Sequence, residues 1–274
     1  MPNFSRFSIS DIKNRQKNSP PLVCISAYTY PIAKIIDDYC DIILVGDSVG
    51  MSIYGMKNTL EVTVDMMINH GKAVVSATKK SMIIVDLPYG SYEKSANQAY
   101  ETAAKIMDKT GCNAVKLETP ANMAKIVEFL VKKNIPVIGH VGLMPQYIKD
   151  FKDYKFQGRD AKQGAQIVED AMKIADAGAF GVVIEGVVQN IAETITEKLS
   201  IPTIGIGASF KCDGQVLVID DILGINQEFK PRFVKHYADL AEQIRNAAQS
   251  YASEVTTRQF PSEKHCFNPS SDKK

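Results

Sequence analysis

Short runs rich in valine, isoleucine and leucine recur along the whole sequence and alternate with longer segments of mixed polarity. Most of these runs are apolar at both odd and even positions, which is typical of parallel strands covered on both faces. The runs span residues 22–27, 41–45, 82–87, 113–117, 135–139, 180–184, 201–206 and 216–219. Such an alternation predicts an α/β fold built on a parallel sheet.

The segments between these runs carry the period of an amphipathic helix. In segment 123–131, apolar residues occur at offsets 0, 3, 4, 7 and 8, so they share one helix face. Segment 167–175 repeats the pattern at offsets 0, 4, 7 and 8, and segment 64–75 follows it less regularly. Thr63 and Thr119 stand where a side chain would cap the helix that follows.

Eight strand-like runs alternating with helices favour a (β/α)₈ TIM barrel, and a doubly wound open sheet is the alternative. A barrel of this kind forms one domain from about 250 residues. We therefore expect a single domain over residues 1–267, followed by a disordered tail over residues 268–274. The first 20 residues predict an N-terminal helical extension over the bottom of the barrel.

Composition excludes several classes of partner. The chain has 32 Lys+Arg and 31 Asp+Glu, a net charge of +1, so bulk electrostatic binding to nucleic acid or an acidic membrane is not expected. No run approaches the roughly 18 apolar residues of a membrane span, and the N-terminus lacks the apolar core of a secretory signal. Five cysteines without a CxxC pair indicate neither a disulfide framework nor a zinc ribbon. These features predict a cytoplasmic protein without a nucleic-acid or membrane partner.

Ionisable side chains stand at the carboxyl ends of five consecutive strand-like runs. In a (β/α)₈ barrel these ends ring a single mouth, where the active site lies. Any one of these residues alone is as readily a turn or cap residue, but five at the same topological position predict one site. The residues are Asp47 with Ser48, Asp86, Lys116 with Glu118, His140 and Glu185.

The three acidic residues Asp47, Asp86 and Glu118 predict a magnesium site. Carboxylate oxygens without thiolate neighbours suit Mg²⁺ better than Zn²⁺. Three carboxylates crowded together would also repel one another unless a cation lies among them. Because Mg²⁺ usually takes one or two protein carboxylates and keeps waters, we expect one of the three to act from outside the first coordination sphere.

The remaining strand-end residues suit a reaction on an acidic substrate. Lys116 can neutralise a substrate carboxylate or a developing oxyanion, and His140 can donate a hydrogen bond to it. Glu185, on the following strand, is then available as a general base. Lys116 and Glu118 share strand parity, so they point to the same side, and a plain salt bridge in the mouth is the alternative reading of this pair.

Longer motifs occur in a fixed order along the chain. They read ILVGDSVGM, GMKNTLEVT, VDLPYGSY, VKLE, IPVIGHVGLMPQ, KFQGR, IPTIGIGAS and DGQVLV, and they end with the tail FPSEKHCF. Together they cover about Val23 to Phe267, and the pair GDSxGM and GHxGLxPQ is highly specific. On these motifs the chain resembles the 3-methyl-2-oxobutanoate hydroxymethyltransferase family, also called the ketopantoate hydroxymethyltransferases.

The resemblance implies a barrel of the phosphoenolpyruvate/pyruvate-like superfamily and, as in bacterial members, a homodecamer of two five-membered rings. It implies transfer of a hydroxymethyl group from 5,10-methylenetetrahydrofolate to 3-methyl-2-oxobutanoate, which gives ketopantoate. This is the committed step toward pantothenate and coenzyme A. The expected chemistry is aldol-type bond formation through an enolate stabilised by one Mg²⁺ per subunit.

The resemblance also implies roles for the strand-end residues. Asp47 and Asp86 match the Mg²⁺ ligands, which also contact the substrate, and Glu118 matches a third acidic position that often reaches the metal through water. The expected contacts of the keto acid are Ser48, Lys116 and His140. Glu185 matches the proton acceptor.

Two mouth segments depart from the family pattern, and two other functions stay open. After Glu185 the chain reads Gly-Val-Val where many relatives have Val-Pro after one residue, and after GIGA it reads Ser-Phe-Lys-Cys. Both departures bear on how the folate is positioned. One alternative is another Mg²⁺-dependent barrel lyase or mutase that acts on a 2-oxo acid, although the sequence lacks the KKCGH-like cysteine loop expected of one. The other alternative is a non-catalytic barrel that serves as a scaffold.

Overall fold

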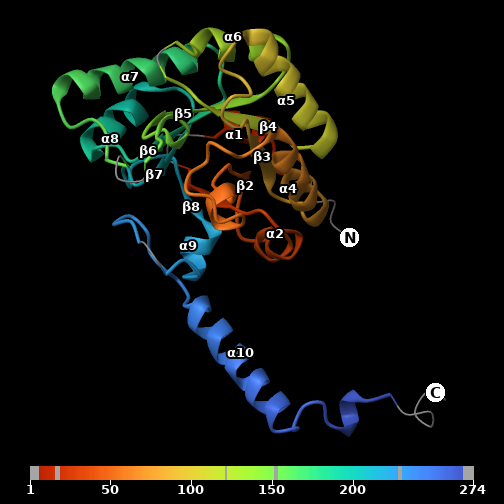
Figure 1. Ribbon diagram of the computed structural model, residues 1–274. Helices are drawn as coiled ribbons and strands as arrows, with labels where there is room; N and C mark the ends of the chain where they lie inside the picture. The colour runs from red at the N-terminus through yellow and green to blue at the C-terminus, as the bar shows by residue number, and fades with distance from the viewer. Residues whose placement is uncertain (1–5, 16–18, 121, 151–153, 228–229, 268–274) are drawn as a thin grey trace. The chain divides into compact units, whose positions relative to one another are not determined.

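The computed structural model describes residues 6–15, 19–120, 122–150, 154–227 and 230–267. Within them, eight parallel strands close into a barrel in sequence order, as Figure 1 shows. The strands are β1 (Leu22–Ser26), β2 (Ile42–Val45), β3 (Met82–Asp86), β4 (Ala114–Glu118), β5 (Val137–Gly142), β6 (Gly181–Glu185), β7 (Thr203–Ile206) and β8 (Gly214–Val218). Each strand-like run of the sequence therefore forms a strand, and the predicted (β/α)₈ barrel is confirmed.

Helices connect most of the strands and lie outside the barrel (Figure 1). They are α2 (Tyr30–Ile36), α3 (Val49–Ser52), α4 (Val64–Ala77), α5 (Ala96–Thr110), α6 (Ala124–Lys132), α7 (Ala161–Asp176) and α8 (Gln189–Lys198), and the 3₁₀ helix η1 (Pro145–Tyr147) follows β5. The connection from β7 to β8 is the exception, because the described segment 207–213 contains no helix. The alternation predicted from the sequence therefore holds up to β7.

Side-chain caps define where several of these helices begin. Thr63, Ser95 and Asp160 each accept a hydrogen bond from a backbone N–H in the first turn of α4, α5 and α7. The cap predicted at Thr63 is confirmed. The cap predicted at Thr119 is wrong, because α6 has Met123 at its N-cap and Thr119 lies directly after β4, where its hydroxyl donates to a β5 carbonyl.

Alternate strand residues face the interior of the barrel. Toward the amino ends of the strands these positions are apolar, and they pack together as one buried core. Toward the carboxyl ends of the strands, the inward-facing positions become polar. Asp86 is the next inward residue after Ile84 on β3, and Lys116 is the next after Ala114 on β4. The core comprises Ile12, Leu22, Cys24, Ile42, Leu44, Met82, Ile84, Ala114, Ile138, Phe180, Val183, Ile204 and Val216. The interior of the barrel is thus packed with apolar side chains at the amino ends of the strands and lined by polar side chains at their carboxyl ends.

The N-terminal extension closes the apolar end of the barrel. Helix α1 (Ile9–Lys13) begins at Ser8, whose side chain accepts a hydrogen bond from the N–H of Asp11. Ile12 on α1 is buried in the core, and Phe7 packs against the same cluster. The predicted helical extension over the barrel bottom is therefore confirmed.

The chain divides into two compact units, Met1–Ile219 and Asp220–Lys274. Helix α9 (Ile219–Leu223) begins at the division, and the second unit contains α10 (Leu240–Thr256) and the 3₁₀ helix η3 (Glu263–His265). The single domain expected over residues 1–267 stays a prediction, and the expected tail over 268–274 lies outside the described residues. None of the helices in the described ranges has the length and apolar character needed to cross a bilayer.

Candidate active site

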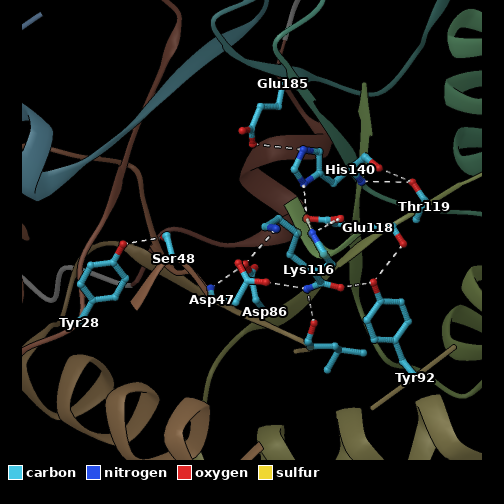
Figure 2. Close-up of polar contacts among 12 residues, drawn as sticks. Tyr28, Asp47, Ser48, Asp86, Tyr92, Lys116, Glu118, Thr119, His140 and Glu185 are labelled. Atoms are coloured by element: carbon cyan, nitrogen blue, oxygen red, sulfur yellow. Dashed lines mark hydrogen bonds and ion pairs between the residues drawn. The ribbon is translucent and has the colours of Figure 1, made fainter. Parts of the chain in front are cut away.

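The strand-end residues predicted from the sequence meet at the carboxyl-terminal mouth of the barrel (Figure 2). The strand register places Asp86 beside Lys116 on the β3–β4 pair and Glu118 beside His140 on the β4–β5 pair. Glu185 ends β6, the next strand around the barrel. Because all these positions share the inward parity, their side chains converge on one small volume although they are far apart in sequence.

A buried ion pair lies at the centre of this volume. The Lys116 Nζ is 3.0 Å from the Asp86 Oδ2, and the same oxygen accepts the Asp47 backbone N–H at 3.1 Å. Burial and the charge of Asp47 raise the pKa of Asp86 to about 7, against the effect of Lys116. Burial opposes the charge of Lys116, but the carboxylates of Asp86, Asp47 and Glu118 outweigh it and raise the pKa of the lysine. Lys116 is therefore a fixed cation in a water-poor site.

Glu118 adds a third buried carboxyl group to the site. Its side-chain oxygens accept the backbone N–H of Gln146 at 3.1 and 3.3 Å. Burial, together with the charge of Asp47, raises the pKa of Glu118 well above its ordinary value, although Lys116 and the Gln146 N–H oppose this. Asp47, Asp86 and Glu118 thus face one buried lysine, and the site has more acidic groups than it has cations to balance them.

His140 lies between two of the acids. Its Nε2 is 3.4 Å from the Glu185 Oε2, and its Nδ1 is 3.9 Å from the Glu118 Oε1. Burial lowers the pKa of His140, although the adjacent Glu185 favours the charged form, so the ring is neutral near pH 7. The Glu185 side chain is 18% exposed, against 3% for His140. Figure 2 shows Glu185 on the far side of His140 from Glu118, so Glu185 is the acid that faces the opening of the site.

A short chain of hydrogen bonds through Tyr28 and His70 supports Ser48. Its Oγ lies 2.7 Å from the hydroxyl of the buried Tyr28. The carbonyl oxygen of Tyr28 accepts a hydrogen bond from His70 Nδ1 at 2.7 Å, and the Tyr54 hydroxyl lies 3.0 Å from His70 Nε2. Because a carbonyl can only accept, His70 Nδ1 carries the proton that it donates to Tyr28. His70 therefore orders Tyr28, the residue that contacts Ser48.

The sequence reasoning missed Gln146, which lies at the centre of the site on the 3₁₀ helix η1. Its Nε2 donates to the Asp47 Oδ2 at 2.8 Å and to the Leu87 carbonyl at 2.9 Å. Its Oε1 accepts the Tyr92 hydroxyl at 2.5 Å, and its backbone N–H reaches Glu118. The amide is thus fully hydrogen-bonded, and it links the acid that follows β2 to the acid at the end of β4.

Gln146 and Tyr28 escaped notice for a common reason. The site was predicted from acidic and basic side chains at strand ends. An amide or a phenol that supports such groups cannot be distinguished in the sequence from an ordinary polar residue. Gln146 closes the motif GHVGLMPQ, so the motif marks its position but not its contacts. Tyr28 lies two residues beyond the end of β1 at Ser26, in the same topological position as the acids.

The residues present fit a Mg²⁺ ion. Asp86 Oδ1 is buried and has no hydrogen-bond partner among the described residues, so one carboxylate oxygen is available to a cation. Gly46 keeps the adjacent space clear, since a Cβ there would lie 2.9 Å from Ser48 Oγ and 3.6 Å from Asp86 Oδ2. In the described part of the chain, no three acidic, histidine or cysteine side chains are grouped to hold a metal alone. A Mg²⁺ ion usually takes one or two protein carboxylates and completes its shell with water and substrate oxygens, and Asp47 and Asp86 are the residues that could hold it.

Solved structures with the same architecture support the fold. The chain resembles a phosphoenolpyruvate phosphomutase from Streptomyces platensis subsp. rosaceus, with a TM-score of 0.59 and 11% identity over 95% of this chain and 91% of that one. It also resembles 2,3-dimethylmalate lyase, a member of the PEP mutase/isocitrate lyase superfamily, with a TM-score of 0.60 and 11% identity over 94% and 87%. At this identity the likeness concerns the fold.

Sequence comparison is more specific. The family model for ketopantoate hydroxymethyltransferase matches residues 6–263. A curated relative from Sinorhizobium fredii, a 3-methyl-2-oxobutanoate hydroxymethyltransferase, is 53% identical over 251 residues, which cover 92% of each chain. A relative of the same name from Brucella canis is also 53% identical, over 92% of this chain and 91% of its own length. The match takes in the strand ends that bear the acids, the lysine and the histidine of the mouth, and the chain belongs to the ketopantoate hydroxymethyltransferase family.

Proposed function

We propose that this protein transfers a hydroxymethyl group from 5,10-methylenetetrahydrofolate to 3-methyl-2-oxobutanoate and so forms ketopantoate, the committed step toward pantothenate and coenzyme A. The single observation that carries the proposal is the placement of Glu185. It is a carboxylate at the opening of a site whose floor holds a buried lysine among acids. A base that faces a buried cation is what proton removal from a 2-oxo acid requires.

In this proposal the keto acid binds over Lys116. The ammonium group neutralises the substrate carboxylate, and the Ser48 hydroxyl, fixed by Tyr28, donates a hydrogen bond to it. His140 is neutral, so it can donate to a developing oxyanion without adding a proton to the bound substrate. The depth of Lys116, 4% exposed, excludes water and strengthens these contacts.

Asp47 and Asp86 would hold one Mg²⁺ ion, with Glu118 bound directly or through water. The ion would supply a second positive charge to the keto oxygen of the substrate, where negative charge develops as the C3 proton leaves. The excess of buried acids over buried bases around Lys116 supports this assignment, because a divalent cation would balance it.

The chemical step then belongs to Glu185. Its carboxylate removes the proton from C3 of the keto acid, and the electron pair left on C3 attacks the methylene carbon of the folate co-substrate. Both carbon–nitrogen bonds of that methylene group break: one is replaced by the new carbon–carbon bond, and the other by the bond to the oxygen of a water molecule, which becomes the product hydroxyl. The proton taken from C3 and one proton of the water end on the two folate nitrogens, so that tetrahydrofolate leaves. The His140 Nε2 lies 3.4 Å from the Glu185 Oε2, so the ring packs beside the base.

We also propose a cytoplasmic homodecamer, a pentamer of dimers, without a nucleic-acid or membrane partner. The family resemblance supports the assembly. The second unit adds support, because apolar side chains of α10 are exposed in the single chain, among them Ile244, Tyr251 and Val255. Light scattering coupled to size-exclusion chromatography tests this, and a monodisperse monomer at micromolar concentration would overturn it.

A steady-state assay tests the reaction itself. Purified protein is incubated with 5,10-methylenetetrahydrofolate and 3-methyl-2-oxobutanoate, and ketopantoate is measured with and without Mg²⁺. We expect ketopantoate only when both substrates and the metal are present. Proton exchange at C3 of the keto acid, measured by NMR in D₂O, should proceed with Mg²⁺ and without the folate. Protein that forms no product under these conditions contradicts the proposal.

A further inference from the structure

An open pocket of about 510 Å³ lies between the segment before α7 and the first residues of α8. Its size is within the range of small-molecule sites. Part of its wall comes from the motif KFQGR, residues 155–159, to which the proposed reaction gives no role. The lining residues are Phe156, Gly158, Arg159, Asp160, Ala161, Val188, Asn190 and Ile191.

This pocket is attached directly to the segment that carries Glu185. The backbone N–H of Gln157 donates to the Gly186 carbonyl at 2.7 Å, and the Val188 N–H donates to the Gln157 carbonyl at 3.0 Å. Gln157 thereby pairs in parallel with Val187, two residues beyond Glu185. Phe156 and Val188, which flank this bridge, both line the pocket. A ligand in the pocket would therefore lie on the side of the barrel mouth where the base is located.

The motif is held rigidly. Gln163 Oε1 accepts the N–H groups of Gly158 and Arg159 at 2.7 and 3.1 Å. Gly158 has φ +80, a conformation that favours glycine. The Asp160 side chain accepts the N–H of Gln163 at 2.8 Å, so its carboxylate is already engaged in capping α7. The turn that presents Arg159 is thus fixed before any ligand arrives.

Arg159 is aimed by two contacts with Phe156. Its Nε donates to the Phe156 carbonyl at 3.0 Å, and its guanidinium carbon is 4.3 Å from the centre of the Phe156 ring. No carboxylate of the described residues forms an ion pair with Arg159. A guanidinium stacked on a ring keeps its terminal donors available in the plane that pairs with a carboxylate. The pocket therefore presents a preorganised carboxylate site next to an exposed aromatic face.

We propose that this pocket binds the aminobenzoyl-glutamate part of the folate co-substrate, with a glutamate carboxylate on Arg159 and the aromatic ring against Phe156. The inference rests on the proposed function, because it presumes a folate. The keto acid occupies the buried end of the mouth over Lys116, so the second substrate has to approach from the side where Glu185 is exposed. A long co-substrate with a flat ring and a terminal carboxylate matches a pocket on that side with a flat face and a free guanidinium.

The test compares two one-carbon donors that differ only at this end. These are 5,10-methylenetetrahydrofolate and the primary amide of 5,10-methylenetetrahydropteroate, called the pteroate donor below, which lacks the glutamate and carries no carboxylate. For the unaltered protein we expect the KM of the pteroate donor to be about tenfold higher, the loss typical of one charge-assisted contact near a surface. Arg159→Gln should raise the KM of the folate donor by the same factor and leave the KM of the pteroate donor unchanged. Arg159→Lys should restore part of the difference.

Lys162→Gln is the matched control, because it removes one exposed positive charge on the first turn of α7 without altering the pocket lining. It should leave both KM values unchanged. The KM of the keto acid and the folate-independent exchange of its C3 proton should be the same in all variants, which a merely unfolded variant would not show.

The outcomes separate the two claims. Suppose that the unaltered protein transfers the hydroxymethyl group and that Arg159→Gln shows the same ratio of KM values for the two donors as the unaltered protein. The pocket assignment is then wrong and the proposed function stands. If the unaltered protein exchanges the C3 proton but transfers nothing from either donor, the proposed function fails and the pocket assignment fails with it.

Discussion

Gln146 donates a hydrogen bond from its side-chain amide to the Asp47 Oδ2 at 2.8 Å, across 99 residues of sequence. The contact fixes which oxygen of the Asp47 carboxylate the protein engages. The same residue touches Glu118 through its backbone N–H. Gln146 thus sets the spacing of two of the acids in the site.

Replacing Gln146 by leucine should weaken both the fold and the proposed metal site. The change keeps the volume nearly constant but leaves Asp47 and the Leu87 carbonyl without their donor, and it leaves the Tyr92 hydroxyl only its longer hydrogen bond to the Glu118 carbonyl at 3.3 Å. Each unmade buried hydrogen bond costs about 1–3 kcal/mol. We expect a lower free energy of unfolding, measured in urea, and a higher Mg²⁺ concentration for half-maximal C3 proton exchange. The same change at the exposed Gln166 is the control, and equal effects at the two positions would remove Gln146 from this role.

Glu185→Gln should abolish proton removal and keep substrate binding. Glutamine retains the size and the polar contact with His140 but cannot accept a proton, and positioned general bases contribute about 10²–10⁴-fold. Exchange of the C3 proton with D₂O, followed by NMR, should fall by that factor, while binding of the keto acid with Mg²⁺, measured by calorimetry, should change little. Glu169→Gln, on the exposed side of α7, is the control. Near-normal exchange in Glu185→Gln would show that another group is the base.

Tyr28→Phe should affect binding of the keto acid more than turnover. The change removes only the hydroxyl that lies 2.7 Å from Ser48 Oγ, so the serine loses the partner that orients it. The loss of one neutral hydrogen bond is worth about 0.5–1.5 kcal/mol, and we expect the KM of the keto acid to rise by up to about tenfold with a smaller change in kcat. Tyr39→Phe removes the same hydroxyl from a side chain that is 75% exposed and should have no effect. A change in kcat alone would mean that Tyr28 takes part in the chemical step.

The sequence was most informative where chemistry and strand parity coincide. Asp86 and Lys116 could be placed in the mouth because each stands at the carboxyl end of a strand-like run, and the structure shows that each follows an apolar inward residue of its own strand at a spacing of two. The contacts of Gln146 could not be predicted, because they depend on how η1 folds back over the ends of β2 and β4, which no local pattern encodes. The helix cap predicted at Thr119 is wrong for a related reason. A threonine hydroxyl can bond either a helix N-terminus or a nearby carbonyl, and only the tertiary structure brings the carbonyl of His140 within reach.

The acid stability of the fold should depend on Asp37, which lies beyond the end of α2, outside the site. Its carboxylate accepts the backbone N–H groups of Lys79, Lys80 and Ser81 at 2.6 to 3.2 Å. Burial alone would raise the pKa of Asp37, but these donors lower it below its ordinary value of 3.8. The ionised form is therefore the one that the fold favours.

The sign of the pH dependence follows from that direction. A group whose pKa is lower in the folded state contributes its full stability above the pKa of the unfolded state and loses it as the pH falls through the folded value. In Asp37→Asn, one carboxylate oxygen becomes an amide NH₂ group, so a single neutral oxygen is left to accept from the three backbone N–H groups. The free energy of unfolding at pH 7 should therefore fall by about 1–3 kcal/mol. The difference from the unaltered protein should shrink as the pH falls below about 4. Urea unfolding at fixed protein concentration, at pH 7 and at pH 3.5, measures both values.

Asp38→Asn is the control. It removes a neighbouring acid that is 60% exposed and paired with Lys80, and an exposed ion pair of this kind is worth at most about 1 kcal/mol. A loss in Asp37→Asn that is no larger than in Asp38→Asn, or that persists undiminished at pH 3.5, would mean that the charge of Asp37 does not stabilise this turn.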